Sequence, residues 1–192
     1  EGGLGGWAAV GAVPAQLISA AQRRITLRDV PLAGCPPWLG VDRAIGAWAG
    51  WTRSSKLSLD LSSGLLLVDA GTVLSITVLS PDGEFVGGQL IPGYRLQLSA
   101  MTQGTEALPE TVFVAPGKEQ FPKDTMSAMR RGVLQAMVSA VQDAQRACGG
   151  LLWLCGGDAE LLATELRHSS PQLQLDPELQ LRGLFDLLDA SI

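Results

Sequence analysis

The sequence predicts an α/β domain built around three consecutive antiparallel strands. Short apolar runs at residues 65–69, 73–79 and 84–91 follow one another, and only turn-like segments separate them. A longer segment that begins near Asp124 carries apolar residues at every third or fourth position, which is typical of an amphipathic helix. Successive strands without intervening helices do not form the regular βαβ series of a Rossmann fold.

The composition is that of a chain that can fold around an apolar core. Of the 192 residues, 46% are hydrophobic and 17% are charged, which allows one or two compact domains. The net charge is −5 and no long basic run occurs, so we expect no nucleic-acid partner. The apolar runs are far shorter than the roughly 20 residues that cross a bilayer, so we expect no membrane insertion. The three cysteines have the spacing of neither a disulfide framework nor a zinc site, which favours a reducing cytoplasm.

The first sixty residues alternate between helical and extended patterns. Residues 14–24 have helical spacing, and residues 25–27 are expected to form a short strand. Three prolines at positions 31, 36 and 37 interrupt regular structure. Helical spacing returns at residues 41–51, so a helix should start near Asp42, and the serine-rich residues 54–63 are expected to form a loop.

The remainder of the chain alternates strands and helices. Residues 65–69 are expected to be a buried strand, and the sequence at residues 80–83 favours a tight turn between the next two strands. Helical spacing follows at residues 94–101, and Asp124 or Thr125 can cap the long helix. Residues 151–154 predict a strand, Asp158 can cap a helix at residues 159–166, and a last helix is expected near residues 182–189.

The segment Gly40-Val41-Asp42-Arg43 is the first candidate site. It places a carboxylate and a guanidinium together where a loop enters a helix. The carboxylate of Asp42 can orient a substrate hydroxyl, while Arg43 and the helix N-terminus attract anionic groups. An aspartate in the first helical turn is also an ordinary capping residue, and the local sequence leaves both explanations open.

Two glycine-containing segments are further candidates. In Asp69-Ala70-Gly71-Thr72, the glycine allows a ligand to approach the backbone, the threonine offers a hydroxyl, and Asp69 offers oxygen ligands for a hard cation. An ordinary turn is the commoner explanation of such a segment. Gly156 and Gly157 open another helix, where glycines can expose amide donors to a nucleotide, although glycine turns are common.

Six motifs, taken in order, resemble those of the type III pantothenate kinases, a branch of the actin, sugar kinase and Hsp70 superfamily. The resemblance covers nearly the whole chain and implies a ribonuclease H-like (actin-like ATPase) fold of two similar halves, residues 1–62 and 63–192. The first half lacks its N-terminal strands, because the Asp-x-Gly-Asn-Thr motif of the family is missing, and we expect the chain to start inside a longer protein. The motifs are Leu39-Gly-Val-Asp-Arg43, Val68-Asp-Ala-Gly-Thr72, Gly87-Gly-Gln-Leu-Ile-Pro-Gly93, Gly104-Thr-Glu-Ala-Leu-Pro109, Asp124-Thr125 and Cys155-Gly-Gly-Asp158.

The resemblance implies a function and a set of site residues. ATP would phosphorylate pantothenate to 4′-phosphopantothenate, the first step of coenzyme A synthesis, with Mg²⁺ and a monovalent cation, K⁺ or NH4⁺. The enzyme would be a cytoplasmic homodimer with its substrate site near the subunit interface. Asp42 would be the catalytic proton acceptor and Asp69 the ligand of the monovalent cation. Pantothenate would contact Gly40, Val41, Asp42, Arg43 and Thr125, and ATP would contact Gly71, Thr72, Gly156 and Gly157.

Departures from the family pattern keep other functions open. Pro36 stands where the family often has a substrate-contacting tyrosine, and Cys155 replaces a threonine before the glycine pair. The main alternative is a non-catalytic relative that binds a partner or regulates transcription. Another small-molecule kinase of the same superfamily, such as a sugar kinase, is a third possibility.

Overall fold

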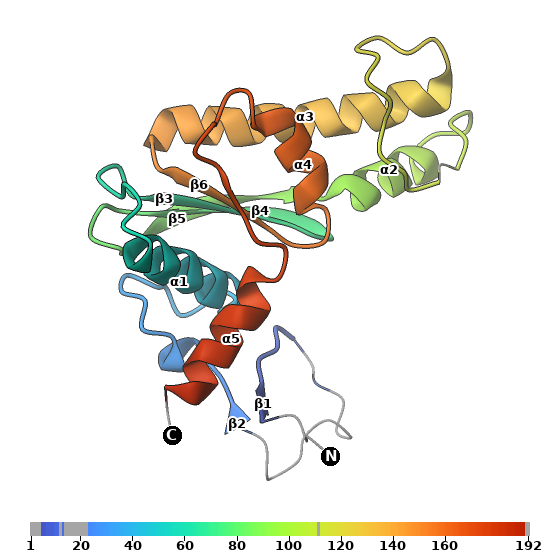
Figure 1. The fold of residues 1–192 in the computed structure, drawn as a ribbon. Helices are drawn as coiled ribbons and strands as arrows, with labels where there is room; N and C mark the ends of the chain where they lie inside the picture. Colours follow the sequence, from blue (N-terminus) through green and yellow to red (C-terminus); the bar gives the residue numbers. More distant parts are fainter. Residues whose placement is uncertain (1–4, 12, 14–22, 111, 191–192) are drawn as a thin grey trace.

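The computed structural model describes residues 5–11, 13, 23–110 and 112–190, which form a central sheet between two layers of helices (Figure 1). The sheet has five strands in the order β5-β4-β3-β6-β7, and a separate parallel pair is formed by β1 and β2. The elements are β1 (Gly6–Trp7), β2 (Arg23–Arg24), a 3-10 helix (Leu27–Asp29), α1 (Val41–Lys56), β3 (Leu65–Ala70), β4 (Val73–Leu79), β5 (Phe85–Pro92), α2 (Tyr94–Gln103), α3 (Thr125–Cys148), β6 (Leu151–Cys155), α4 (Ala159–Leu166), β7 (Gln174–Leu175) and α5 (Leu179–Asp189).

The predicted meander is confirmed. Strand β4 pairs antiparallel with both β3 and β5, while β6 and β7 extend the sheet in parallel from β3. The turn between β4 and β5 is closed by the amide of Gly83, which donates to the carbonyl of Ser80. Gly83 has a φ of 80°, a conformation that favours glycine, so the Asp-Gly pair in the sequence was an informative signal.

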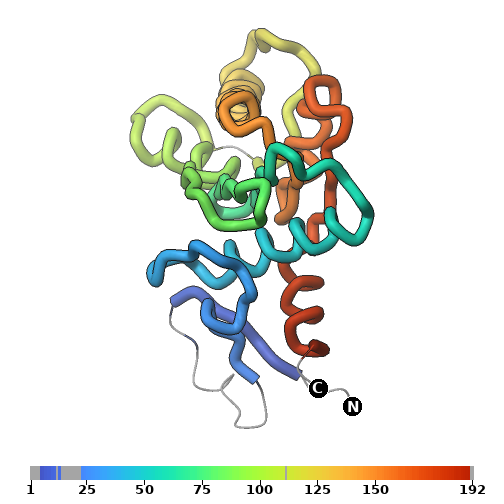
Figure 2. Tube along the Cα trace, turned by 90° about the vertical axis from the view of Figure 1, so that its left-hand side faces the viewer, coloured from blue at the N-terminus to red at the C-terminus, as the bar shows by residue number. Residues whose placement is uncertain are grey.

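The pleat of β3 divides the apolar core into two halves. Leu66 and Val68 face the core beneath α3 and α4, whereas Leu65 and Leu67 face the core shared with α1 and α5. Figures 1 and 2 show α3 and α1 on opposite faces of the sheet. The near-continuous apolar sequence of β3 therefore reflects burial on both faces.

Helix α3 is longer than the sheet that it covers, and its first turns form an arm with α2 (Figure 1). The predicted cap is confirmed, because Asp124 accepts a hydrogen bond of 2.9 Å from the amide of Ser127. The helix ends at Cys148 and is capped by Gly149, which has a φ of 68°. Asp158 occupies the predicted N-cap position of α4, but its side chain makes no capping hydrogen bond.

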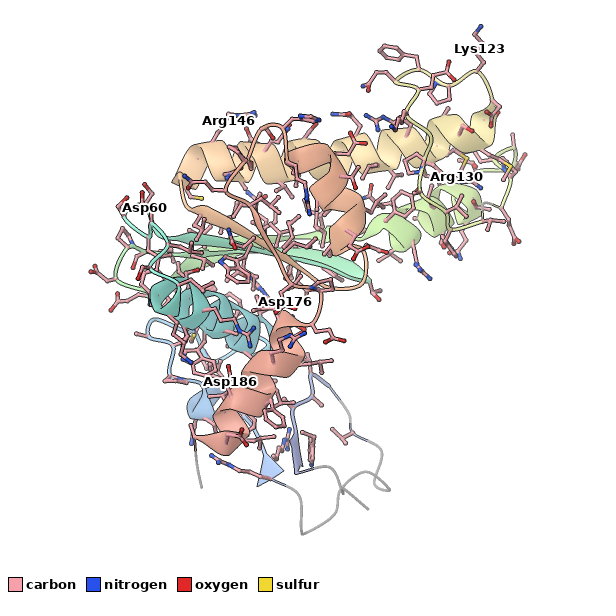
Figure 3. All side chains as sticks on the ribbon, in the orientation of Figure 1. Asp60, Lys123, Arg130, Arg146, Asp176 and Asp186 are labelled. Atoms are coloured by element: carbon pink, nitrogen blue, oxygen red, sulfur yellow. The ribbon has the colours of Figure 1, made fainter. Side chains whose placement is uncertain are left out.

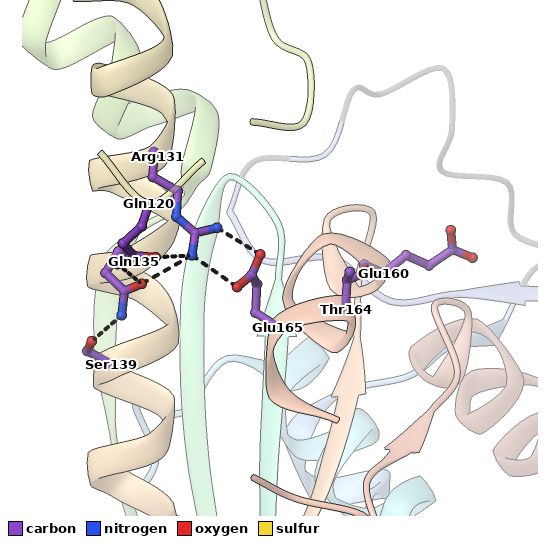
Figure 4. Close-up of polar contacts among 7 residues, drawn as sticks. All are labelled: Gln120, Arg131, Gln135, Ser139, Glu160, Thr164 and Glu165. Atoms are coloured by element: carbon purple, nitrogen blue, oxygen red, sulfur yellow. Dashed lines mark hydrogen bonds and ion pairs between the residues drawn. The ribbon is translucent and has the colours of Figure 1, made fainter. Parts of the chain in front are cut away.

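A nearly buried arginine ties α3 to its surroundings (Figure 4). Arg131 donates to both carboxylate oxygens of Glu165 on α4, at 2.8 and 3.2 Å, and to the side-chain oxygen of Gln120 at 2.9 Å. Gln120 belongs to the loop between α2 and α3, which carries Lys123 at its outer tip (Figure 3). The loop is thus attached to the body of the domain by a side-chain network.

One expectation was wrong and the start of another element is shifted, and each difference has a local cause. Residues 25–27 do not form a strand, because Asp29 accepts hydrogen bonds of 2.7 Å from both the amide and the hydroxyl of Thr26 and closes a 3-10 turn. The loop expected from residue 54 starts later, since α1 continues to Lys56. Ser54 is buried there, where it donates to the Gly50 carbonyl and accepts from the Trp153 indole.

The other boundaries agree with expectation to within a few residues. Helix α5 starts at Leu179, three residues before the predicted position, and β7 was not predicted. The helix expected at residues 14–24 lies largely outside the described residues. The division of the chain after residue 62 stays a prediction. In the part of the chain that the structure describes, no helix combines the length and apolar character needed to span a membrane.

Candidate active site

The candidate site lies on the α1 face of the sheet, where β3 and β6 end. Asp69 is the penultimate residue of β3, and the two-residue alternation places it on the same face as Leu65 and Leu67. Across the sheet, Asp69 is in register with Ser75 on β4 and Cys155 on β6. A carboxylate thus stands at the end of an otherwise apolar strand.

A side chain on helix α5 donates a hydrogen bond to Asp69. The side-chain amide of Gln180 donates to Asp69 Oδ2 at 2.8 Å. Arg53 on α1 pairs with Asp186 on α5 at 3.6 Å and with Asp176 at 3.2 Å, and Figure 3 shows Asp176 where the chain enters α5. Gln180 was not predicted from the sequence, because it lies 111 residues from Asp69 and no local pattern connects them.

The second oxygen of Asp69 faces a glycine. A Cβ atom at Gly156 would overlap Asp69 Oδ1 and would lie 2.6 Å from the Ala70 carbonyl oxygen. Gly156 also has a φ of 88°, which favours glycine. The predicted glycine pair therefore clears space beside the carboxylate, in addition to opening α4.

Burial perturbs the ionisation of Asp69. Desolvation raises the pKa of this carboxyl above its ordinary value, the hydrogen bond from Gln180 lowers it, and the nearby charge of Asp42 raises it further. Asp42, 27 residues away in sequence, thus acts on Asp69 through its charge. A bound cation would favour the ionised form of Asp69.

Asp42 and Arg43 lie in the first turn of α1. Gly40 occupies the N-cap position, so Asp42 is not the N-cap residue. The Asp42 side chain is exposed, and its Oδ1 accepts the amide hydrogen of Arg43 at 2.8 Å. A Cβ at Gly40 would lie 2.5 Å from that same oxygen, so the glycine leaves room for the carboxylate.

The guanidinium of Arg43 is held by β4. Its Nε and Nη2 donate to the hydroxyl of Thr77 at 3.2 and 3.1 Å, and Nη2 donates to the Ile76 carbonyl at 3.3 Å. Burial lowers the pKa of Arg43 and the neighbouring Asp42 carboxylate raises it. Arg43 was predicted from the sequence, but Thr77 was not, because its role depends on the packing of α1 against the sheet.

Three of the predicted nucleotide contacts line one cavity. Gly71, Thr72 and Gly157 border a cavity of about 440 Å³ together with the start of α2 and the start of α4. The amide of Asp158 donates to the Ala70 carbonyl at 2.8 Å and so fixes the α4 entry to the end of β3. Arg95, which was not predicted, adds a positive charge, and the helix N-termini favour anions.

Two predicted residues do not present their side chains to this cluster within one copy of the chain. Val41 is 8% exposed and packs in the core beneath α1. Thr125 begins α3, which covers the opposite face of the sheet and extends away from it (Figure 1). Within one copy of the chain, the structure groups Asp42, Arg43 and Asp69 and leaves Thr125 apart from them.

One buried hydroxyl beside Asp69 is unsatisfied. Ser75 is 5% exposed, and its Oγ has no hydrogen-bond partner. Buried polar groups normally have partners, so this atom is a candidate ligand for a bound species. In the described part of the chain, no three His, Cys, Asp or Glu side chains gather as a metal cluster, and all three cysteines are free thiols.

Comparisons with known proteins agree on one family. Residues 13–147 match the family model of type III pantothenate kinases. The type III pantothenate kinase of Synechococcus elongatus is 36% identical over 185 residues, which cover 89% of this chain and 68% of that protein. The enzyme of the same description from Synechococcus sp. strain JA-3-3Ab is 35% identical over 184 residues, covering 92% and 72%.

A solved structure supports the fold. A conserved putative Baf family transcriptional activator from Campylobacter jejuni superposes with a TM-score of 0.60, covering 88% of this chain and 73% of that one. The two sequences are 23% identical, so this similarity is evidence for the α/β fold alone.

Proposed function

The chain belongs to the type III pantothenate kinase family, and from this premise we propose that Asp42, Arg43 and Asp69 form the acceptor side of the active site. Its activity is the ATP-dependent phosphorylation of pantothenate to 4′-phosphopantothenate, the first step of coenzyme A synthesis. The observation that supports the site is the contact of the first turn of α1 with β4, where Arg43 bonds Thr77, two residues from Ser75, the register partner of Asp69.

Asp42 serves as the proton acceptor in this proposal. The pantothenate hydroxyl attacks the γ-phosphorus of ATP, the bond to the β,γ-bridging oxygen breaks, ADP leaves, and the hydroxyl proton passes to the Asp42 carboxylate. The transition state of phosphoryl transfer is loose, so the proton moves late and alignment matters more than base strength. The exposed Asp42 carboxylate, free of an N-cap role, is accessible for this task.

The remaining residues divide between the two substrates. Arg43 provides a positive charge for the carboxylate of pantothenate, and Gly40 leaves room for the side chain of Asp42. The cavity bordered by Gly71, Thr72 and Gly157 receives the phosphates of ATP, where Arg95 and two helix N-termini offset their charge.

The residues around Asp69 fit a monovalent cation, K⁺ or NH4⁺. Asp69 Oδ1 lies in the space that Gly156 leaves, and the unsatisfied hydroxyl of Ser75 offers a second oxygen. When bound, the cation supplies positive charge near the transferring phosphoryl group. Mg²⁺ would be held mainly by ATP phosphates and water, with Asp158 as the available carboxylate in the cavity, since Mg²⁺ needs few protein ligands in such sites.

A homodimer would explain the position of Thr125. This residue lies at the start of α3, apart from Asp42, so its contact with pantothenate requires a second copy of the chain. The loop before α3 exposes large apolar side chains, including Phe121 at 83% and Val112 at 66%, which a partner subunit could cover.

The order β5-β4-β3-β6-β7 fits a ribonuclease H-like second half over residues 63–192, with residues 1–62 from the first half. The free thiols favour a reducing cytoplasm.

The cation proposal has a direct test. Phosphorylation of pantothenate by the full-length protein is measured with ATP and Mg²⁺ while K⁺ is varied, for the parent and for Asp69→Asn. The parent should require K⁺, and Asp69→Asn should need a K⁺ concentration at least about tenfold higher, because one charged ligand is lost. Equal K⁺ requirements in both proteins would place the cation elsewhere.

A further inference from the structure

The side chain of Arg43 is fixed by acceptors that carry no charge. Its Nε and Nη2 share the Thr77 hydroxyl oxygen, and Nη2 also reaches the Ile76 carbonyl. Thr77 is completely buried on β4, so it cannot move aside without disturbing the sheet. The hydroxyl therefore sets the direction of the guanidinium fork.

Within the part of the chain that the structure describes, this arrangement leaves Arg43 without a direct ion-pair partner, and the only charge that acts on it is the adjacent, exposed Asp42 carboxylate. Among the described residues, Arg43 takes part in none of the ion pairs, which involve Arg53, Arg131, Arg146 and Arg182 instead. Its Nη1 makes no hydrogen bond within the described residues. A half-buried guanidinium with one free nitrogen and no ion-pair partner among the described residues suits a ligand carboxylate, which can accept two N–H bonds.

The neighbouring strand is shaped to admit this side chain. Gly88 on β5 is in register with Thr77. A Cβ at Gly88 would overlap the Ile76 carbonyl oxygen and would lie 2.6 Å from Arg43 Nη2. Because Gly88 has no side chain, the guanidinium can lie against the edge of the β4–β5 hairpin.

We propose that Thr77 is a positioning residue, which acts through Arg43 to hold the guanidinium for the carboxylate of pantothenate without neutralising it. The proposal rests on the assignment of Arg43 to pantothenate binding. A purely structural role for Thr77 predicts a loss of stability alone, whereas a positioning role predicts a selective loss of pantothenate affinity.

The test compares two substitutions of similar size. Thr77→Val keeps the shape and removes the acceptor, so the KM for pantothenate should rise about tenfold, the effect of losing about one hydrogen bond to a charged group. The kcat and the KM for ATP should change less than about twofold, because neither depends on how tightly Arg43 binds the carboxylate of pantothenate in the ground state. Thr77→Ser restores the hydroxyl and should recover most of the parent KM.

A double-mutant cycle distinguishes an effect through Arg43 from a general one. In an Arg43→Gln background, Thr77→Val should change the KM for pantothenate by less than about twofold, since the group that it positions is gone. Additive effects of the two substitutions, or a Thr77→Val protein that loses kcat and both affinities together, would overturn the positioning role. A parent that does not phosphorylate pantothenate would instead overturn the function on which the inference rests.

Discussion

Removal of Gln180 should shift the pH dependence of the enzyme towards alkaline pH. Gln180→Leu deletes the 2.8 Å hydrogen bond to Asp69 Oδ2 and leaves the rest of the cluster unchanged. A hydrogen bond to a charged group contributes about 1.5–3 kcal/mol, and each pKa unit corresponds to about 1.4 kcal/mol. Loss of this bond should therefore raise the pKa of Asp69, which burial already raises, still further.

The sign of the accompanying stability change follows from linkage. Because burial raises the folded-state pKa of Asp69, the protonated carboxyl stabilises the fold at low pH, and this contribution is lost as the pH rises through the folded pKa. Gln180→Leu enlarges that loss, so the variant should be less stable than the parent by about 1.4 kcal/mol at neutral pH, with a smaller difference in acid.

The assay is the pH profile of kcat/KM for pantothenate, which reports essential groups of the free enzyme. The acid limb of Gln180→Leu should lie about one pH unit above that of the parent. Gln103→Leu, at an exposed position at the end of α2, serves as the control and should retain the parent profile. Identical acid limbs for Gln180→Leu and the parent would refute the role assigned to this hydrogen bond.

Two further predictions concern stability, measured by urea unfolding. Gly156→Ala places a side chain on a backbone with a φ of 88° and against Asp69, so the free energy of unfolding should fall by about 2 kcal/mol. At Gly157 a Cβ meets nothing within 4 Å, so Gly157→Ala should stay within about 0.5 kcal/mol of the parent. Equal losses in the two variants would contradict the crowding at Gly156. Glu165→Leu leaves the Arg131 guanidinium, whose side chain is 9% exposed, without its charge partner, so the free energy of unfolding should fall by about 3 kcal/mol. The double variant Glu165→Leu/Arg131→Met should recover most of this loss, because no unpaired buried charge remains. A double variant no more stable than Glu165→Leu would refute the pairing.

Local sequence signals predicted the elements that carry their own pattern. Three apolar runs bounded by turns gave the meander, and methionines and valines at helical spacing gave α3 together with its Asp124 cap. Strand β7 has only two residues, Gln174 and Leu175, which no periodicity can reveal. The strand predicted at residues 25–27 is absent because local hydrogen bonds between Thr26 and Asp29 override the β propensity of this segment. A threonine followed three residues later by an aspartate is a sequence pattern that favours such a turn.

The candidate site was predicted in part for a similar reason. The motifs supplied Asp42, Arg43 and Asp69, because each lies at the end of an element that the sequence defines. The residues that hold them, Gln180 and Thr77, come from other elements and are identified only by tertiary packing. The assignments of individual residues to pantothenate, ATP and the cation stay predictions.

The central claim is that Asp42 accepts the proton of the pantothenate hydroxyl, and its most direct test is the turnover of Asp42→Asn. The full-length protein is assayed for 4′-phosphopantothenate with saturating ATP, Mg²⁺, K⁺ and pantothenate, and Asp82→Asn in the exposed β4–β5 turn is the matched control. The expected result is a fall in kcat of about 10²–10⁴-fold for Asp42→Asn, the range for losing a general base, with parent-like turnover for Asp82→Asn. A folded Asp42→Asn protein that turns over within about threefold of the parent would contradict the assignment, since a general base should be worth at least about 10²-fold.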